Sequence, residues 1–520
     1  MTGSAPHPYA DALAPHFPSD EEIERLYALQ LLDNPYESLS RVSPEIAELR
    51  AHLEAAYQNT RDLTATWAAE RLRWKRLYQL VHGYCGRRGR AFIDRVNRDA
   101  RERPTVLFVA PWPNYKFLRE AEALRARGVA CYLIALRHDH LVIEVLERQE
   151  FRTAFDEIHE VRRNPLILLA LLRQLRPAVF HVHGEPWTHA VVRTVNEGKR
   201  SSACVVELED VFTVYAERGV MHRVWPKEKV DFAYAMEGHA CRHSDGVVYP
   251  FAPGVQDELE ARHGTRFEGI HFPCYPSPSF TDFGGAKESA RDGRLRTVWA
   301  GNVWLPNPGF PEELFPSAGL VRTLRTLLDD GIGCEIVIDP GKYADFNGPG
   351  WSVYTDLRRY DHFRLGLGVP PAQLSQRINH ADFGLQFAAY DPDRILVRPS
   401  KLRFQISVKF FAYLEAGLPI VVNSEFAFIA DLVERHGIGL AVGIPELASL
   451  GERLRSFDRE AAVENIRRFN HDHSMHREIE RLMAFYERLS PTLWRGSAAG
   501  RNREARRDGE MAVALPPKIA

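Results

Sequence analysis

The segment TVLFVAPWPNYKFLREAEALRARGVACYLIAL (residues 105–136) places a helical pattern between two apolar runs. The runs, TVLFVAP (105–111) and ACYLIAL (130–136), contain no charged residue and have the length of single strands. Uninterrupted apolar runs of this kind are typical of strands buried on both faces of a parallel sheet. The helix between them is expected to end at Gly128. The segment therefore predicts a β-α-β unit.

The same alternation of strand and helix continues along most of the chain. Strands that alternate with helices of ten or more residues build doubly wound sheets. The fold class is therefore α/β, with two Rossmann-like domains whose strand ends face a shared cleft. The further strands expected in the two domains are AVFHVHG (178–184), ACVVELED (203–210), GVVYPF (246–251), HFPCYP (271–276), RTVWAGN (296–302), CEIVID (334–339), ADFGLQF (381–387) and PIVVNS (419–424).

Changes in composition divide the chain into six parts. A Gly-rich, charged stretch without an apolar period separates the two α/β series and is expected to be a linker. The predicted parts are a helical N-terminal region (1–103), an N-terminal Rossmann-like domain (104–280), a linker (281–294), a C-terminal Rossmann-like domain (295–445), C-terminal helices (446–490) and a disordered tail (491–520).

The N-terminal region contains a long helical seam. Apolar residues recur at alternating spacings of three and four from Ile46 to Val81, and only Thr60 and Glu70 interrupt them. Such a seam predicts a coiled coil, so we expect a homo-oligomer formed through residues 44–82; a helical hairpin within one chain is the alternative. Residues 71–103 carry eleven Lys and Arg against three Asp and Glu. This basic surface allows peripheral contact with a membrane, although a solvated helix face explains it equally well.

The overall composition excludes several classes of protein. The 520 residues are 45% hydrophobic and 26% charged, which excludes a wholly disordered or collagen-like chain. A formal net charge of −2 gives no global attraction to nucleic acid. Six cysteines without a CxxC pair, and an N-terminus without a basic or apolar stretch, indicate a cytoplasmic protein.

The segment ISVKFFAYLEAGLPIVVNS (406–424) predicts a helix with an anion site at its start. Ser407 is a suitable N-cap and Lys409 lies in the first turn, while Gly417 and Pro419 end the helix. The free N–H groups of a helix N-terminus attract anions, and a lysine beside them suits a diphosphate. An ordinary capped helix with a solvent-exposed lysine is the alternative.

This segment resembles the donor helix of the family-4 (group 1) glycosyltransferases of the GT-B fold, in the variant S-x-K-x-x-E-Y-x-x-A-G-x-P. The matching positions are Ser407, Lys409, Tyr413, Ala416, Gly417 and Pro419. Weaker similarities follow in the family's order at RPAVFHVHG (176–184), EGHACRHSDGVVYPF (237–251), VWAGN (298–302) and HADFGLQF (380–387).

The resemblance implies a transferase that moves a sugar from a nucleoside-diphosphate sugar to a polysaccharide or glycolipid, with retention of configuration. It implies no cofactor beyond the nucleotide sugar and no bound metal. The donor would lie on the second domain and the acceptor on the first. The residues expected to bind the donor are Gly301, Asn302, Arg398, Ser407, Lys409 and Glu415, and those expected in catalysis are His183 and Asp210.

The chain departs from the family pattern in the donor helix. Phe404 and Ala412 occupy the positions of the family's E-x7-E carboxylates, so Glu415 is a candidate replacement for the carboxylate that binds the ribose. The basic residues that commonly follow the glycine turn are missing. Arg394, Arg398, Lys401 and Arg403, just before the helix, are candidate substitutes.

On the acceptor side, His183 ends a strand and is a candidate for assisting proton removal from a hydroxyl. His181 is expected in the core, and Glu185 is a further cleft candidate. The patterns Asp391-Pro392-Asp393 and His138-Asp139-His140 are too short to indicate metal sites. Two other functions stay open: a nucleotide-sugar epimerase, or a non-catalytic coiled-coil scaffold with a degenerate transferase domain.

Overall fold

The computed structural model describes residues 89–110, 114–137, 149–162, 165–185, 188–306, 311–338 and 346–494, without 347 and 349. The expected coiled coil and oligomer contact (44–82), the His138-Asp139-His140 pattern and the tail after residue 494 lie outside the described residues. None of the helices that are described combines the length and the apolar character needed to cross a bilayer.

The first domain is built on a seven-stranded sheet in the order β3-β2-β1-β4-β5-β6-β7, with all pairs parallel. Its central strands β1, β4 and β5 are buried along their whole length, as their apolar sequences predict. The strands are β1 (Thr105–Ala110), β2 (Ala130–Arg137), β3 (Glu157–Arg162), β4 (Val179–Gly184), β5 (Ala203–Leu208), β6 (Gly246–Tyr249) and β7 (Gly269–His271).

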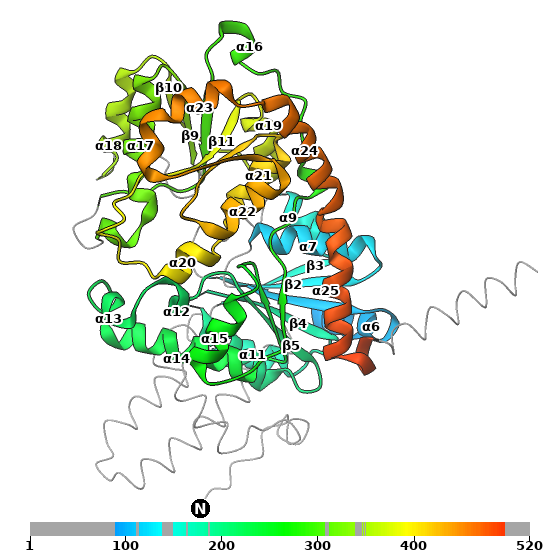
Figure 1. Cartoon of the computed structure of the whole chain (residues 1–520). Coiled ribbons are helices and arrows are strands. Elements are labelled where there is room, and N and C mark those ends of the chain that lie inside the picture. The colour runs from blue at the N-terminus through cyan, green and yellow to red at the C-terminus, as the bar shows by residue number, and fades with distance from the viewer. Residues whose placement is uncertain are drawn as a thin grey trace, which may run out of the picture.

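Helices cover both faces of this sheet (Figure 1). One face packs against α7, α9 and α25, and the other against α6, α10, α11, α14 and α15. The helices of this half of the chain are α6 (Arg90–Glu102), α7 (Tyr115–Ala126), α9 (Gln149–Ala154), α10 (Pro165–Leu172), α11 (His189–Gly198), α12 (Phe212–Tyr215), α13 (Arg218–Met221), α14 (Lys227–His243), α15 (Val255–His263), η3 (Pro278–Phe280) and α16 (Ser289–Asp292).

The second domain holds a six-stranded parallel sheet in the order β10-β9-β8-β11-β12-β13. The strands are β8 (Arg296–Ala300), β9 (Gly333–Ile338), β10 (Phe363–Leu367), β11 (Phe383–Gln386), β12 (Ile420–Asn423) and β13 (Gly439–Val442). The helices of this half of the chain are η4 (Glu312–Leu314), η5 (Pro316–Gly319), α17 (Leu320–Asp329), α18 (Ser352–Thr355), η6 (Asp356–Arg359), η7 (Pro371–Gln373), α19 (Leu374–Ile378), α20 (Pro399–Phe404), α21 (Val408–Glu415), α22 (Ala427–His436), η8 (Ile444–Ser449), α23 (Leu450–Ser456), α24 (Arg459–Asp472) and α25 (Met475–Leu489). The expected pair of Rossmann-like domains in a GT-B arrangement is confirmed.

Several boundaries differ from those expected. The strand placed at 271–276 lies earlier, at β7, and β3, β10 and β13 were not expected. Within the region expected to hold C-terminal helices (446–490), His473 and Ser474 separate α24 from α25. Residues 491–494, assigned to a disordered tail, form a further helical turn whose Trp494 is buried against Tyr486.

The two C-terminal helices belong to different domains (Figure 1). Helix α24 packs against α21 and α22 of the second domain, whereas α25 packs against α7 of the first. Ile466 of α24 and Leu482 of α25 accordingly lie in different hydrophobic cores. The chain therefore crosses between the domains a second time.

A buried ion pair joins the domains between α7 and α21. Arg119 donates from Nε to Oε1 of Glu415 (3.0 Å) and from Nη2 to Oε2 (2.6 Å), and each side chain is 3% exposed. The backbone N–H of Ser277 also donates to Oε1 of Glu415 (2.8 Å). The bidentate geometry fixes the position of α21 relative to the first domain.

Residues 396–404, which we call the crossing segment, form a second junction. The N–H of Arg398 donates to the carbonyl of Tyr215 (2.9 Å), and the N–H of Ala252 donates to the carbonyl of Phe404 (2.9 Å). Phe404 itself lies in the core of the first domain. The segment leads directly into α21, so the start of that helix is also held against the first domain.

We expect Arg119→Leu to destabilise the chain strongly, because it leaves the Glu415 carboxylate buried without a counter-ion. The loss should be about 3–5 kcal/mol, and Arg119→Leu/Glu415→Leu should recover much of it. Thermal melting of the full chain measures both. Arg467→Leu, which breaks the exposed Arg467–Glu464 pair, is the control and should cost less than about 1 kcal/mol. Wild-type melting of Arg119→Leu would contradict the assigned role of the pair.

Candidate functional site

The carboxyl end of β8 and the start of α21 meet at one point of the second domain. Strand β8 lies at the place where the strand order of the sheet reverses, the usual ligand position in open α/β sheets. Gly301 follows β8 with a φ of 125°, which favours glycine, and a Cβ there would lie 3.7 Å from Cε of Lys409. The structure thus brings Gly301 and Lys409 together, as expected.

Lys409 has no hydrogen bond or ion pair to any of the described residues. Its Nζ lies 3.5 Å from the centroid of the Trp299 ring, a cation–π contact. Burial lowers the pKa of Lys409 from 10.5 to about 7, because it disfavours the charged form. A bound anion would stabilise the charged form of Lys409, so a buried lysine without an acidic partner is suited to bind one.

Ser407 lies two residues before Lys409 and has the extended backbone of an N-cap, but its side chain makes no capping hydrogen bond. Its buried Oγ has no hydrogen-bond partner in the part of the chain that the structure describes. Asn302 is exposed, and its carbonyl accepts a hydrogen bond from Nε1 of Trp299 (3.1 Å). The carboxyl end of β8 and the start of α21 therefore bring together Gly301, Asn302, Ser407 and Lys409.

The other two residues expected to bind the donor face elsewhere. Both carboxylate oxygens of Glu415 bind Arg119, so this residue does not offer the ribose carboxylate that the sequence suggested. Arg398 lies 3.2 Å from Glu217 and 3.2 Å from Glu258 of the first domain. Both side chains hold the domains together.

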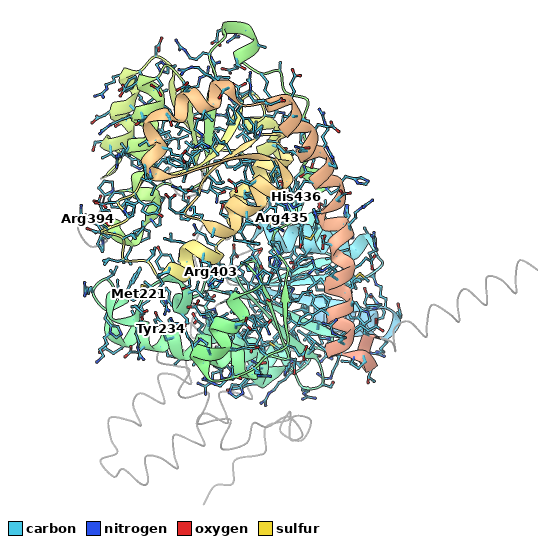
Figure 2. The ribbon with its side chains drawn as sticks, in the orientation of Figure 1. Met221, Tyr234, Arg394, Arg403, Arg435 and His436 are labelled. Carbon is cyan, nitrogen blue, oxygen red and sulfur yellow. The ribbon has the colours of Figure 1, made fainter. Side chains whose placement is uncertain are left out.

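The remaining basic residues before α21 are spread over the domain boundary. Arg403 lies on α20, whereas Arg394 lies at the outer side of the second domain (Figure 2). Arg394 lines a cavity of about 190 Å³ between the loops that follow β8 and β11. Lys401 forms an ion pair with Asp210 (3.3 Å) across the boundary. These residues do not form one cationic cluster at Lys409.

On the first domain, a histidine and a glutamate meet at the ends of β4 and β5. Nε2 of His183 lies 2.5 Å from Oε2 of Glu209, and Nδ2 of Asn114 donates to the same oxygen (3.1 Å). Glu185 lies nearby, with Oε1 3.9 Å from Nε2 of His183. The His183 side chain is fully buried, whereas that of Glu209 is 26% exposed.

The charges of this pair follow from its surroundings. Burial alone would lower the pKa of His183, but the hydrogen bond and charge of Glu209 outweigh burial and raise it to about 9. Burial would raise the pKa of Glu209, but the hydrogen bond from His183 lowers it. The pair is thus an imidazolium with a carboxylate at neutral pH. The structure thus ties Nε2 of His183 to Glu209, and the member of the pair that solvent reaches is Glu209.

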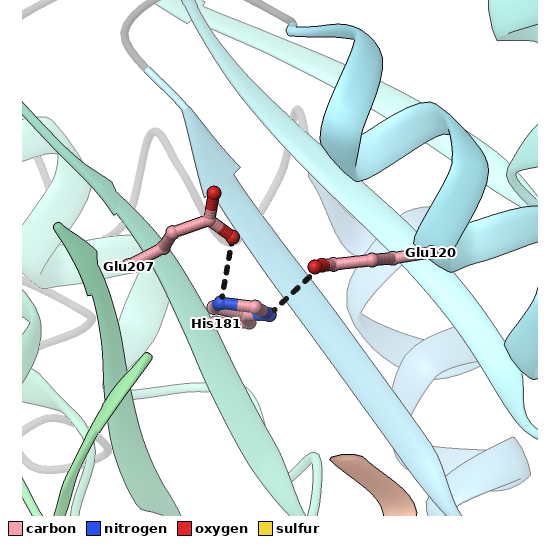
Figure 3. Close-up of side chains that lie close together, drawn as sticks. All are labelled: Glu120, His181 and Glu207. Atoms are coloured by element: carbon pink, nitrogen blue, oxygen red, sulfur yellow. Dashed lines mark ion pairs between the residues drawn. The ribbon is translucent and has the colours of Figure 1, made fainter. Parts of the chain in front are cut away.

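A second charged cluster lies behind this pair, fully buried (Figure 3). His181 lies 3.6 Å from Glu120 and 3.5 Å from Glu207, and the Tyr486 hydroxyl lies 2.7 Å from its Nδ1. Lys116 lies 3.4 Å from Glu120 and 3.0 Å from Glu207. Burial raises the pKa of both glutamates and lowers that of His181. His181 is a core residue, as expected.

Sequence reasoning gave Glu209 no role of its own and missed Glu207. The signal was available, because His181 and His183 on β4 and Glu207 and Glu209 on the neighbouring stretch show the same two-residue spacing. The register pairs His181 with Val205 and His183 with Glu207, and each histidine contacts the glutamate two residues beyond its partner. Nothing in the sequence pointed to Lys116 or Asn114.

Among the described residues, two groups of three side chains are close enough to hold a metal ion: Glu120, His181 and Glu207; and His183, Glu185 and Glu209. In the first group, the Lys116 ammonium already lies close to both carboxylates and offsets part of their charge. In the second, Glu209 is hydrogen-bonded to His183. Asp391 accepts a hydrogen bond from the backbone of Asp393, which forms a local turn.

Comparison with known proteins gives one family match. Residues 351–475, which include α21, match the family described as "Glucosyltransferase 3-like, C-terminal domain". A search with the whole sequence matched no curated protein. The second domain therefore resembles the C-terminal domain of glucosyltransferase 3-like proteins.

Among solved structures, the chain is similar to the N-terminal domain of Candida albicans trehalose-6-phosphate phosphatase (9% identity, 74% of this chain and 97% of that chain, TM-score 0.47). It is also similar to AviGT4, a glycosyltransferase involved in avilamycin A biosynthesis (14%, 75% and 98%, TM-score 0.42). A third is a UDP-N-acetylglucosamine 2-epimerase (12%, 74% and 96%, TM-score 0.43). No activity is inferred from these similarities.

The raised pKa of His183 predicts a pH-dependent stability. The pair stabilises the folded chain fully below the ordinary pKa of 6.5, and this contribution is lost as the pH rises through about 9. His183→Gln should therefore lower stability by on the order of 3 kcal/mol at about pH 6, and much less at about pH 10.

Melting curves of wild type and His183→Gln over this pH range provide the measurement. His222→Gln, which breaks the more exposed His222–Asp231 pair, should cost less than about 1 kcal/mol and serves as the control. An equal difference between wild type and His183→Gln at both pH values would refute the ion pair.

Proposed function

We propose that the protein is a glycosyltransferase that moves a sugar from a nucleoside-diphosphate sugar to an acceptor hydroxyl. The observation that carries the proposal is Lys409, without an acidic partner among the described residues, at the start of α21 and beside the Gly301 turn. The donor diphosphate would bind Lys409 and the first N–H groups of α21. The acceptor would bind at the ends of β4 and β5.

The chemistry of transfer explains why a lysine is needed there. When the sugar leaves, the bond to the diphosphate breaks and negative charge grows on the phosphate oxygens. A fixed ammonium group and helix N–H groups stabilise that charge without reorganisation, and such stabilisation supplies much of the rate enhancement in many transfer reactions. The approach of the diphosphate to the backbone at Gly301 is possible because glycine has no side chain.

Two further findings support the proposal. The region similar to glucosyltransferase 3-like proteins includes Lys409 and the whole of α21. Polar side chains also lie at strand ends in both domains, namely His183 and Glu209 at the ends of β4 and β5 and Asn302 after β8, where ligands of open α/β sheets bind. Retention of configuration, a polysaccharide or glycolipid acceptor, and a cytoplasmic location near a membrane are parts of the proposal that come from the sequence.

A non-catalytic scaffold is the second candidate, because Phe404 and Ala412 are buried apolar residues where the family resemblance implies carboxylates. Thermal melting of the full chain with UDP, GDP and ADP separates the two functions. A transferase is stabilised by at least one nucleotide, and a scaffold by none. An acceptor requirement separates a transferase from an epimerase.

Lys409→Ala should weaken binding of the preferred nucleoside diphosphate at least about tenfold, because a charge-assisted hydrogen bond is lost. The bare nucleoside should bind the variant and wild type alike. Lys409→Arg, which keeps the charge, should retain most of the affinity. Calorimetric titration of wild type, Lys409→Ala and Lys409→Arg measures these affinities.

The pH dependence provides an independent control. The pKa of Lys409 is about 7, so affinity for a nucleotide sugar should fall several-fold as the pH rises above 7. The affinity of Lys409→Arg should stay constant, because arginine does not lose its proton in this range. If Lys409→Ala binds the diphosphate like wild type, the donor site has been placed wrongly.

Metal removal tests how the diphosphate charge is neutralised. Because Lys409 and the N–H groups of α21 supply positive charge, EDTA should change the affinity for nucleoside diphosphate by less than about threefold. Titration with and without EDTA, with added Mg²⁺ as the control, measures this. A loss of affinity of more than about tenfold in EDTA would show that a metal ion binds the diphosphate.

A further inference from the structure

The Glu209 carboxylate is held by one oxygen only. Oε2 receives hydrogen bonds from both His183 (2.5 Å) and Asn114 (3.1 Å). Oε1 has no hydrogen bond to any residue that the structure describes, and the side chain is 26% exposed. Because Oε2 is held by two hydrogen bonds, Oε1 can accept a further hydrogen bond from a ligand.

The two donors that hold Glu209 are themselves fixed. His183 is fully buried on β4. The Asn114 side chain caps α7 by accepting from the N–H of Phe117 (2.8 Å), and donates to Glu209 with its other end. The direction of Oε1 is therefore set before any ligand arrives, so binding there costs little side-chain entropy.

Glu209 also lies at the boundary between the domains. The next residue, Asp210, forms an ion pair with Lys401 of the crossing segment. Glu185, 24% exposed, adds a second carboxylate on the same edge. The side chains that solvent reaches at the ends of β4 and β5 are therefore the carboxylates of Glu209 and Glu185, in contrast to the lysine at the start of α21.

We propose that Oε1 of Glu209 accepts a hydrogen bond from the acceptor, and that Glu209 and Glu185 select acceptors with hydroxyl or ammonium groups over acceptors with phosphate at this position. This rests on the proposed function, since it assigns the acceptor side of the same site. A hydroxyl or ammonium group donates to a carboxylate, whereas a phosphate is repelled by it. Lipid-linked acceptors are thus expected to present an uncharged or amino sugar here, away from their phosphate groups.

Three hexoses of matched size test this: glucosamine, glucose and glucose 6-phosphate, titrated into the full chain without nucleotide and followed by ligand-observed NMR. Glucosamine is expected to bind at least about fivefold more tightly than glucose, and glucose 6-phosphate more weakly than glucose. In Glu209→Gln the ratio of glucosamine to glucose affinity should fall to about one. Glu217→Gln, which removes the same charge from an exposed position on the boundary, should keep the wild-type ratio.

Three results would overturn the proposal: glucose 6-phosphate binding as well as glucosamine, an unchanged ratio in Glu209→Gln, or no binding of any hexose. Melting curves confirm that each variant is folded. Nucleotide binding is measured separately on the same proteins. If the donor proposal fails, the protein does not bind nucleotide but keeps the expected order of hexose affinities. If this inference fails, the protein binds nucleotide but does not show that order.

Discussion

The buried ion pair between Arg119 and Glu415 sets the geometry on which the rest of the site depends. Its partners lie 296 residues apart in the sequence, on α7 of the first domain and α21 of the second. Burying two charges is costly unless their hydrogen bonds are satisfied, so the pair tolerates little displacement of either helix. Lys409 lies at the other end of α21, and its position relative to the first domain is therefore fixed.

Helix α7 connects this pair to the acceptor edge. From its N-terminus onward, Asn114 holds Glu209, Lys116 forms ion pairs with Glu120 and Glu207, and Arg119 holds Glu415. One helix thus organises the acceptor carboxylate, the buried cluster behind it and the helix that carries the donor lysine. The crossing segment and α25 add contacts between the domains, and Tyr486 of α25 reaches the same buried cluster through His181. The two halves of the site are consequently parts of one packed structure.

The sequence predicts the buried elements well and the exposed ones poorly, for a physical reason. Strands β1, β4 and β5 are buried on both faces and appear as apolar runs. The strands that were missed or misplaced, β3, β7, β10 and β13, are the four edge strands, and all four are partly exposed. Charged residues also interrupt the apolar pattern of β3 (EIHEVR) and β10 (FRLGL). In the site, the pairing of Gly301 with Lys409 followed from local motifs and a family resemblance. The partner of Glu415 could not be predicted, because no local pattern indicates a contact between distant helices.

The central claim is that a nucleoside diphosphate binds where β8 meets α21. A crystal structure of the full chain with the nucleoside diphosphate that stabilises it most tests this directly. We expect a phosphate oxygen within about 3.2 Å of Nζ of Lys409, with the diphosphate against the Gly301 turn and the N-terminus of α21. A diphosphate bound elsewhere, with Lys409 still lying on Trp299 and touching no phosphate, would contradict the account.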